Sequence, residues 1–496
     1  MIWLLAISAA VRAVVAAHVE FGNDEVYYWA YAMYPDWSHF DHPPMVGWVI
    51  QLFSLNLLFD SELFIRLASV VLMTVNTWLM YLIGKEAKDA RAGFFAALLY
   101  TASIYAFIIT GIFIMPDTPL SLFWLLAFWM AIRYLKADHP EGKHILLTGL
   151  FAGLAVLSKY SGAFIWVGVL LYLLLYDRKR FRDPKLYLAM LITALCCLPI
   201  LYWNLKNDFA SFSFHGERVS LFGKPNLNTL GTEVAGEFFY NNPVNYVLAI
   251  IATVAAFRGK LKMDPSIQRL VLCTALPMIG LFLFFSLTRP TLPHWNAPGF
   301  VMLIILSACM IRNYKPVIGA LTVLVLVLGI GVAQINTGFI TLDHHTEPER
   351  LGRDDFSLDM FGWRQLETKF AALRESKIAE GVMKEDDGIV ADEWFPLSNL
   401  DYYVAQPLGM RAMGLGGVER IHKYAWINKE RGGLHHGEDY WFLYDTRYPR
   451  DPSNLFPGQF QSIEFVGVIP IERGGRTAKN FFVYACKNLQ QTKDPD

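Results

Sequence analysis

The chain has few charged residues for its length. Only 18% of its 496 residues are Asp, Glu, Lys or Arg, whereas ordinary soluble proteins carry about 25%. The formal net charge of −1 provides no excess of cationic side chains for binding a nucleic-acid backbone. The hydrophobic fraction, by contrast, reaches 54%. This composition argues against a nucleic-acid-binding or ordinary soluble protein and favours a membrane protein.

Several chemical motifs are also missing. Four of the five cysteines lie in apolar stretches, and no Cys-x-x-Cys pair is present. No glycine-rich phosphate loop follows a predicted strand, and no Ser/His/Asp or zinc-ligand spacing is found. The sequence therefore indicates neither a disulfide framework nor a nucleotide-dependent enzyme, and the only cofactor left open is a divalent cation.

Apolar segments long enough to cross the roughly 30 Å hydrocarbon core recur up to residue 338 and then stop. The first begins at Met1 and resembles a signal peptide with small residues near Ala16. We favour a retained helix because the segment lacks a basic start and contains Arg12. We expect about eleven transmembrane helices, centred near Ala10, Val75, Ser103, Leu125, Leu154, Val169, Leu195, Ile251, Leu281, Leu306 and Val327.

Lys and Arg divide unequally between alternate loops. Seventeen lie in five loops near residues 85–91, 133–143, 178–185, 258–269 and 312–315, against five in the alternate set. The positive-inside rule makes the first set cytoplasmic. The Asp24, Asp117 and Lys159 loops and the carboxy terminus are then extracytoplasmic, in a multi-pass membrane protein.

The expected fold is mainly α-helical, with a membrane domain over residues 1–340 and a soluble α/β domain over residues 341–496. The second region is polar and rich in turns. Its apolar periodicity predicts a helix over residues 362–379 and strands over residues 388–391, 440–444, 464–469 and 480–485. A further apolar stretch over residues 45–59 is predicted to lie in the membrane interface after Pro43-Pro44.

The loop with Asp24 and Glu25 has an unusual setting. No Lys or Arg occurs between Val14 and Ile65, and acids beside a membrane are usually functional. The aromatic residues that follow, Tyr27 among them, either anchor the chain at the interface or stack on a sugar. We expect a functional role for Asp24.

Other charged and polar residues fall in loops on the same predicted face. Asp117 fits a helix N-cap or a ligand-binding acid. Lys159 is either a snorkelling lysine or a phosphate ligand. The remaining candidates are His42, Arg66, Arg289 and His294. Together they predict a site for a phosphorylated, hydroxylated substrate linked to lipid.

Five motifs in order carry a resemblance to a known family. They are Asn23-Asp24-Glu25-Val26-Tyr27-Tyr28-Trp29, Phe40-Asp41-His42-Pro43-Pro44, Pro116-Asp117-Thr118-Pro119-Leu120, Leu157-Ser158-Lys159-Tyr160 and Pro293-His294-Trp295-Asn296. With them the chain resembles GT-C membrane glycosyltransferases, in the bacterial branch of the dolichyl-phosphate-mannose protein mannosyltransferase family that is related to the lipid A aminoarabinose transferase. Phe361-Gly362-Trp363-Arg364-Gln365-Leu366 resembles the opening of that family's outer domain.

The resemblance implies an inverting transfer of a sugar from a polyprenyl-phosphate donor to a hydroxyl of a glycolipid or of a protein Ser/Thr. Asp24 would be the catalytic base, supported by Glu25. Lys159, with Arg66 or Arg289, would stabilise the leaving phosphate. Asp24, Glu25 and Asp117 are also candidates to hold a divalent cation. A transporter or flippase of a polyprenyl-linked glycan is the alternative function, and the donor sugar stays open.

Overall fold

The computed structural model describes residues 1–136, 142–218 and 225–490. The chain forms two compact units. Unit 1 comprises Met1–Ala17 and Pro35–Leu328, and unit 2 comprises His18–Tyr34 and Gly329–Asp496. The loop with Asp24 and Glu25 thus belongs to the same unit as the polar carboxy-terminal region. The predicted division into a transmembrane domain over residues 1–340 and an extracytoplasmic soluble domain over residues 341–496 stays a prediction.

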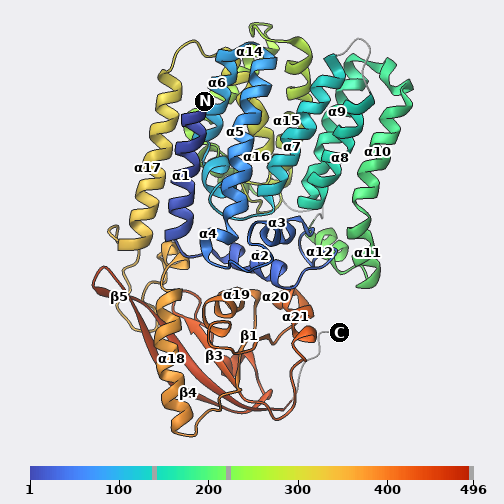
Figure 1. Ribbon diagram of the computed structural model, residues 1–496. Coiled ribbons are helices and arrows are strands. Elements are labelled where there is room, and N and C mark those ends of the chain that lie inside the picture. The colour runs from blue at the N-terminus through green and yellow to red at the C-terminus, as the bar shows by residue number, and fades with distance from the viewer. Residues whose placement is uncertain (137–141, 219–224, 491–496) are drawn as a thin grey trace. The chain divides into compact units, whose positions relative to one another are not determined.

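Unit 1 is a bundle of helices (Figure 1). Its elements are α1 (Ile2–His18, apart from the last residue), α3 (Met45–Phe53), α4 (Glu62–Ile65), α5 (Leu67–Ala87), α6 (Ala90–Ala102), the π-helix η1 (Tyr105–Ile109), α7 (Asp117–Lys136), α8 (Gly142–Ser158), η2 (Tyr160–Ala163), α9 (Phe164–Tyr176), η3 (Arg178–Arg182), α10 (Pro184–Cys196), α11 (Leu198–Lys206), α12 (Ala210–Arg218), α13 (Leu227–Tyr240), α14 (Pro243–Phe257), α15 (Pro265–Ser286), α16 (Ala297–Met310) and the first part of α17 (Lys315–Thr337).

Within the described residues, five helical stretches are long and apolar enough to cross a membrane, or six if α1 and α2 (Asn23–Met33) form one bent span. The five are α5, α7, the continuous α10–α11, α15 and α17. Shorter apolar helices fill the bundle between them, among them α8, α14 and α16. The predicted polytopic helical class is confirmed, and the number of about eleven spans is not.

Local chemistry explains where several of these helices begin. Side chains of Asp89, Asp183, Asn226, Asn242 and Asp264 accept hydrogen bonds from backbone N–H groups of the first turns that follow them. Such caps satisfy donors that have no partner inside a helix. They mark where new helices begin, at the ends of the apolar segments.

Small residues let the helices approach closely. A Cβ atom on Gly149 of α8 would lie 2.2 Å from the Ala189 carbonyl oxygen of α10. Glycine at this position therefore allows backbone-to-backbone contact, as is usual where helices pack without help from water.

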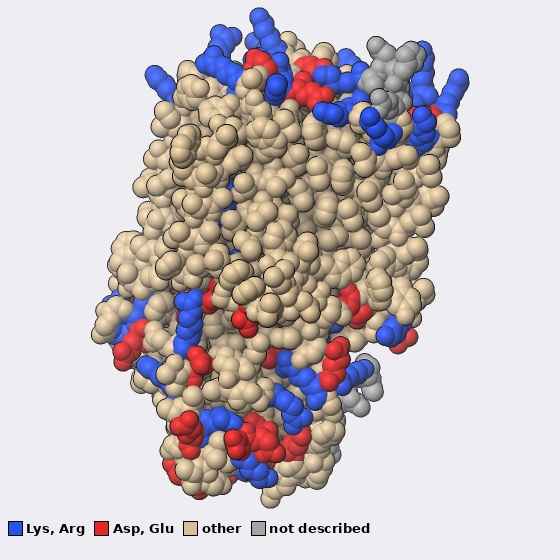
Figure 2. Space-filling model, in the orientation of Figure 1, with Lys and Arg blue, Asp and Glu red and all other residues tan. Residues whose placement is uncertain are grey.

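The described residues of the five basic loops lie together at one end of unit 1. Lys88 Nζ donates to the Cys309 carbonyl at 2.7 Å, and Lys136 lies 3.1 Å from Asp264. Figure 2 shows Lys and Arg gathered at this end of the helical unit, above a wall of uncharged side chains. The structure thus groups the loops as the charge count does, while the side of the membrane they face stays a prediction.

Unit 2 is an α/β unit with one five-stranded sheet of order β2-β1-β3-β5-β4. Strands β1, β2 and β3 are parallel, and β5 runs antiparallel to both β3 and β4. Its elements are α2 (Asn23–Met33), η4 (Phe356–Met360), α18 (Trp363–Ala379), β1 (Gly388–Ala391), α19 (Trp394–Leu400), η5 (Asp401–Ala405), β2 (Ala412–Gly414), α20 (Val418–Ile421), α21 (Tyr424–Glu430), β3 (Tyr440–Asp445), α22 (Pro452–Leu455), β4 (Phe460–Arg473) and β5 (Arg476–Leu489).

Helix α2 is part of the core of unit 2. Tyr27 packs on Trp394 of α19 with ring centroids 5.0 Å apart, and Trp29 packs on Tyr402 at 5.1 Å. Helix α18 covers the sheet, where Phe370 meets Trp441 at 5.3 Å (Figure 1). This packing fixes the amino end of α2, where Asp24 and Glu25 lie, against the core of unit 2.

Candidate active site

Asp117 and Lys159 form a buried ion pair in unit 1. Lys159 Nζ lies 2.7 Å from Asp117 Oδ2, and the two side chains are 12% and 1% exposed. The Tyr105 hydroxyl donates to Asp117 Oδ1 at 3.1 Å. Charges persist in such surroundings only when they are paired and hydrogen-bonded. The sequence-predicted acid and cation are therefore direct neighbours.

Lys159, Asp117 and Tyr105 each lie at the end of a helical element. Helix α8 ends at Ser158 because Lys159 adopts an extended conformation, with φ −158° and ψ 139°. Asp117 is the first residue of α7, directly after Pro116. Tyr105 begins the π-helical segment η1, a conformation that is often found at functional sites. Three element ends thus converge on one ion pair.

Two predicted histidines join this cluster. His42 and His294 each interact electrostatically with both Asp117 and Lys159. Burial lowers the pKa of both imidazoles to about 4. Both rings are consequently neutral near pH 7 and can donate or accept a hydrogen bond without adding positive charge. Lys159 is therefore the cation of this four-residue cluster.

The loop that carries His294 is fastened by two buried glutamates of α13. Glu233 accepts a hydrogen bond from Thr291 Oγ1 at 2.7 Å, and Glu237 accepts one from Asn296 Nδ2. Glu233 is 1% exposed and Glu237 is fully buried. Burial raises the pKa of Glu237 to about 7. Sequence reasoning missed both residues, although their spacing of four, on one face of a helix, was a usable signal.

Asp24 and Glu25 have different surroundings within unit 2. Glu25 is 2% exposed, and its Oε2 accepts a hydrogen bond from the Gly22 backbone N–H at 2.9 Å. Asp24, in the same first turn of α2, is exposed. Tyr27 is only 1% exposed. Glu25 therefore caps the helix, while the Asp24 carboxylate reaches the surface of its unit.

The two predicted arginines contact other groups. Arg66 is fully buried and donates to the Ala16 carbonyl at 2.9 Å, which ties α5 to α1. The Arg289 guanidinium lies 4.6 Å from the centre of the Phe285 ring. Their assignment to the donor phosphate stays a prediction.

Arg12 is another buried cation in unit 1. It is fully buried in α1, and none of its guanidinium nitrogens finds a hydrogen-bond partner in the described part of the chain. The guanidinium lies 4.5 Å from the centre of the Phe107 ring. A Cβ on Gly111 would lie 2.8 Å from Arg12 Nε. Arg12 thus packs on η1, the segment whose Tyr105 holds Asp117.

A metal role for Asp24, Glu25 or Asp117 stays a prediction. Both carboxylate oxygens of Asp117 already have partners, Lys159 on one and Tyr105 on the other. A cation at Asp117 would have to displace the Lys159 ammonium. The geometry of unit 1 therefore suits an ion pair at this position better than a metal ligand.

Comparison with known proteins agrees with the motifs. A family profile described as dolichyl-phosphate-mannose-protein mannosyltransferase matches residues 41–203. This stretch contains His42, Asp117 and Lys159. The chain is 22% identical to the lipid A galacturonosyltransferase RgtD of Rhizobium johnstonii over 79% of this chain and 81% of that one. These matches confirm the resemblance to the GT-C membrane glycosyltransferases.

Other members of this group are similar in sequence or fold. The chain is 24% identical to an undecaprenyl phosphate-alpha-4-amino-4-deoxy-L-arabinose arabinosyl transferase of Proteus mirabilis and spans about half of it, 52%. The crystal structure of ArnT from Cupriavidus metallidurans bound to undecaprenyl phosphate matches with a TM-score of 0.62 at 14% identity, over 98% of this chain and 97% of that one. That match confirms the predicted GT-C fold.

Proposed function

We propose that the chain moves a sugar from a polyprenyl-phosphate donor to a hydroxyl of an envelope glycolipid such as lipid A, with inversion at the anomeric carbon. The buried Lys159, fixed by Asp117 and accompanied by two neutral imidazoles, is the observation that carries the proposal. The named relatives act on lipid A or use undecaprenyl-phosphate sugars. A flippase function is not favoured, because these relatives are transferases.

The leaving group of this reaction is the lipid phosphate. Its oxygen takes the electron pair when the bond to the anomeric carbon breaks, so it requires stabilisation of negative charge more than protonation. Lys159 supplies a positive charge that stays in place, since Asp117 and the turn after α8 hold it. His42 and His294 supply hydrogen bonds to the phosphate or to sugar hydroxyls.

The attacking group is the acceptor hydroxyl. We assign its deprotonation to Asp24, whose carboxylate takes the proton as the new oxygen–carbon bond forms. Glu25 supports Asp24 indirectly, because its cap on Gly22 fixes the first turn of α2. Tyr27 supports the same helix from within the core.

We further propose that the site faces the extracytoplasmic side, together with the soluble domain of residues 341–496. The mutual contacts of the basic loops support this orientation, because they gather the Lys and Arg residues at one end of unit 1.

The test replaces Asp24 by Asn in the purified protein and measures sugar transfer from undecaprenyl-phosphate sugars to lipid A. Loss of a positioned base lowers the rate about 10²–10⁴-fold. Glu25→Gln is the matched control, since the amide oxygen of glutamine still accepts the Gly22 N–H, and it should keep the rate within about tenfold of wild type.

Two results would contradict the proposal. Wild-type activity in the Asp24→Asn variant would show that Asp24 is not the catalytic base. The wild-type protein could instead transfer sugar to a Ser/Thr peptide and not to lipid A in the same assay. That result would show that the acceptor is a protein and not a glycolipid. Mass spectrometry of envelope lipids and glycoproteins from cells with and without the chain would identify the acceptor independently.

A further inference from the structure

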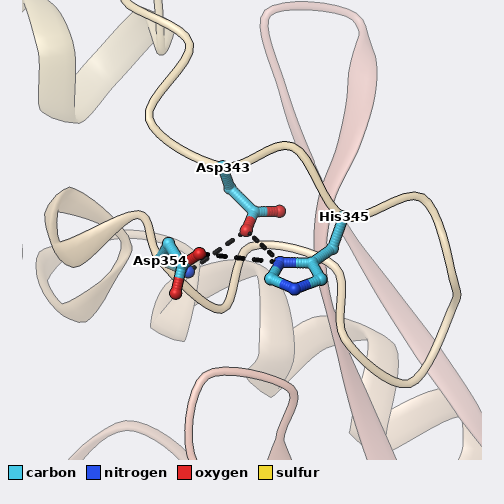
Figure 3. Close-up of side chains that lie close together, drawn as sticks. All are labelled: Asp343, His345 and Asp354. Carbon is cyan, nitrogen blue, oxygen red and sulfur yellow. Dashed lines mark hydrogen bonds and ion pairs between the residues drawn. The ribbon is translucent and has the colours of Figure 1, made fainter.

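Unit 2 contains a group of metal-ligating side chains away from every residue assigned above. Asp343, His345 and Asp354 come from the segment between α17 and η4, and Figure 3 shows their side chains directed toward one another. His345 Nδ1 lies 2.8 Å from Asp343 Oδ1 and 3.8 Å from Asp354 Oδ2. All three candidate ligand atoms lie within 4.8 Å of one another.

These separations suit a small divalent ion. Zinc binds oxygen and nitrogen ligands at about 2.0–2.2 Å, so the ligands of a tetrahedral zinc ion are about 3.3–3.6 Å apart. The two measured separations, 2.8 and 3.8 Å, lie on either side of this range. Since all three atoms lie within 4.8 Å of one another, an ion between them requires side-chain movements of about an ångström.

The three side chains also carry a net negative charge that a cation can balance. Neighbouring acids in this part of unit 2 have arginine partners: Asp355 pairs with Arg473, and Asp359 pairs with Arg447. Among the described residues, the ion-pair partner of both Asp343 and Asp354 is His345 alone. Two carboxylates that share one imidazole leave a negative charge that a divalent ion would neutralise.

Asp343 is also held in a ligand-like orientation. Its Oδ2 accepts the Gly352 N–H at 2.8 Å, and its Oδ1 accepts the Asp354 N–H at 3.2 Å. Hydrogen bonds of this kind orient the carboxylates of metal sites. They fix Asp343 while leaving one lone pair on Oδ1 toward the His345 Nδ1 atom.

A cavity beside the group leaves room for a further ligand. It has a volume of about 250 Å³ and is lined by Asp343, His344 and His345, together with Arg473 and Thr477 on the β4–β5 hairpin. Water from this cavity can complete a tetrahedral shell that has three protein ligands.

We propose that Asp343, His345 and Asp354 bind one zinc ion that fastens the segment of residues 343–354 within unit 2. The mixed oxygen and nitrogen donor set favours zinc over calcium and magnesium, which prefer oxygen alone. The ion joins the two ends of a twelve-residue stretch beside the β4–β5 hairpin. This site is structural and does not depend on the proposed sugar transfer.

The test measures zinc bound to the full-length protein in detergent after treatment with a chelator. We expect one zinc ion per chain by isothermal titration calorimetry and by elemental analysis. His345→Gln and Asp354→Asn should each weaken binding more than tenfold, because loss of an outer partner of a ligand alone costs about 10–100-fold. His344→Gln, which removes the adjacent histidine, is the matched control and should bind zinc as wild type does.

Cobalt gives a second readout. Co²⁺ in this site should show the intense visible absorption of a tetrahedral ion, and His345→Gln should abolish it. Zinc should also raise the melting temperature of the wild-type protein and of His344→Gln, but not that of Asp354→Asn. Unchanged zinc affinity in His345→Gln and Asp354→Asn, or preference for Ca²⁺ over zinc, would overturn the assignment. Sugar transfer measured on the same variants keeps this test separate from that of Asp24.

Discussion

The ion pair between Asp117 and Lys159 offers the sharpest quantitative test of the site. We consider Asp117→Asn, Lys159→Met and the variant with both changes. Removing one partner of a buried pair leaves an uncompensated charge, which costs about 3–5 kcal/mol. Lys159→Met should lie toward the upper end, because the remaining carboxylate is 1% exposed and keeps only the Tyr105 hydroxyl. Asp117→Asn should cost about 3 kcal/mol, since the Lys159 side chain is 12% exposed and can extend toward water.

The double variant should be much more stable than the sum of the single changes predicts. Asparagine still accepts the hydrogen bond from Tyr105, and methionine keeps the length of the lysine side chain without its charge. Replacing a whole buried pair by neutral groups is often close to neutral in stability. We therefore expect a coupling energy of at least about 2 kcal/mol between the two positions.

Unfolding by SDS in mixed micelles, followed by tryptophan fluorescence, measures these free energies. Lys136 and Asp264 provide the control pair. They lie 3.1 Å apart, but their side chains are 32% and 25% exposed, so the corresponding cycle should give less than about 1 kcal/mol. Equal coupling in the two cycles would refute the argument from burial.

Activity separates the structural role of the pair from its role in catalysis. Lys159→Met and the double variant should both lose sugar transfer, since both lack the charge that stabilises the leaving phosphate. Asp117→Asn keeps the ammonium and should retain part of the activity at a temperature where it remains folded. Recovery of activity in the double variant, in parallel with its stability, would show that Lys159 acts only through folding.

Two further predictions concern residues near this pair. Arg12→Met should leave the free energy of unfolding unchanged or raise it, because it removes a buried charge that has no hydrogen bond. The same change should lower kcat, because it disturbs η1. Arg133→Met, which removes an exposed cation above the Trp129 ring, is the control for both the free energy of unfolding and kcat. Glu237→Gln should remove a pH dependence of the free energy of unfolding. Burial raises the Glu237 pKa from 4.5 to about 7, so between these pH values the folded state retains a proton that the unfolded chain releases. The free energy of unfolding of the wild type therefore falls by up to about 3 kcal/mol as pH rises from about 4.5 through 7. Unfolding at pH 5 and pH 8 measures that difference, and equal slopes in wild type and variant would contradict it.

Local sequence signals predicted the elements of unit 2 with differing success. Helix α18 and strand β1 agree with prediction to within a residue, because an amphipathic period and a short apolar run are purely local signals. Strand β2 was missed, since its three residues, Ala412–Gly414, become a strand only by pairing with β1. Strands β4 and β5 are longer than predicted, at 14 residues each. Pro470 is compatible with β4 because β4 lies at the edge of the sheet.

The candidate site divides in the same way between local and distant signals. Asp117 and Lys159 were found because each is a charge at the end of an apolar segment, a feature visible in the sequence alone. Their direct contact was not predictable, since it joins positions 42 residues apart. Glu233 and Glu237 were missed because their partners, Thr291 and Asn296, are about 60 residues further along the chain. Sequence reasoning thus detects unusual residues more easily than the neighbours that explain them.

Asp24 and Glu25 illustrate how helix geometry divides the work of adjacent residues. In sequence they are a single acidic pair next to an apolar segment. An α-helix turns by about 100° per residue, so the two side chains of the first turn of α2 point in different directions. Glu25 turns inward to the Gly22 N–H and becomes buried, whereas Asp24 stays exposed. The inward acid can therefore be replaced by its amide without loss of the cap, while the exposed Asp24 is the acid that we propose takes the proton of the acceptor hydroxyl.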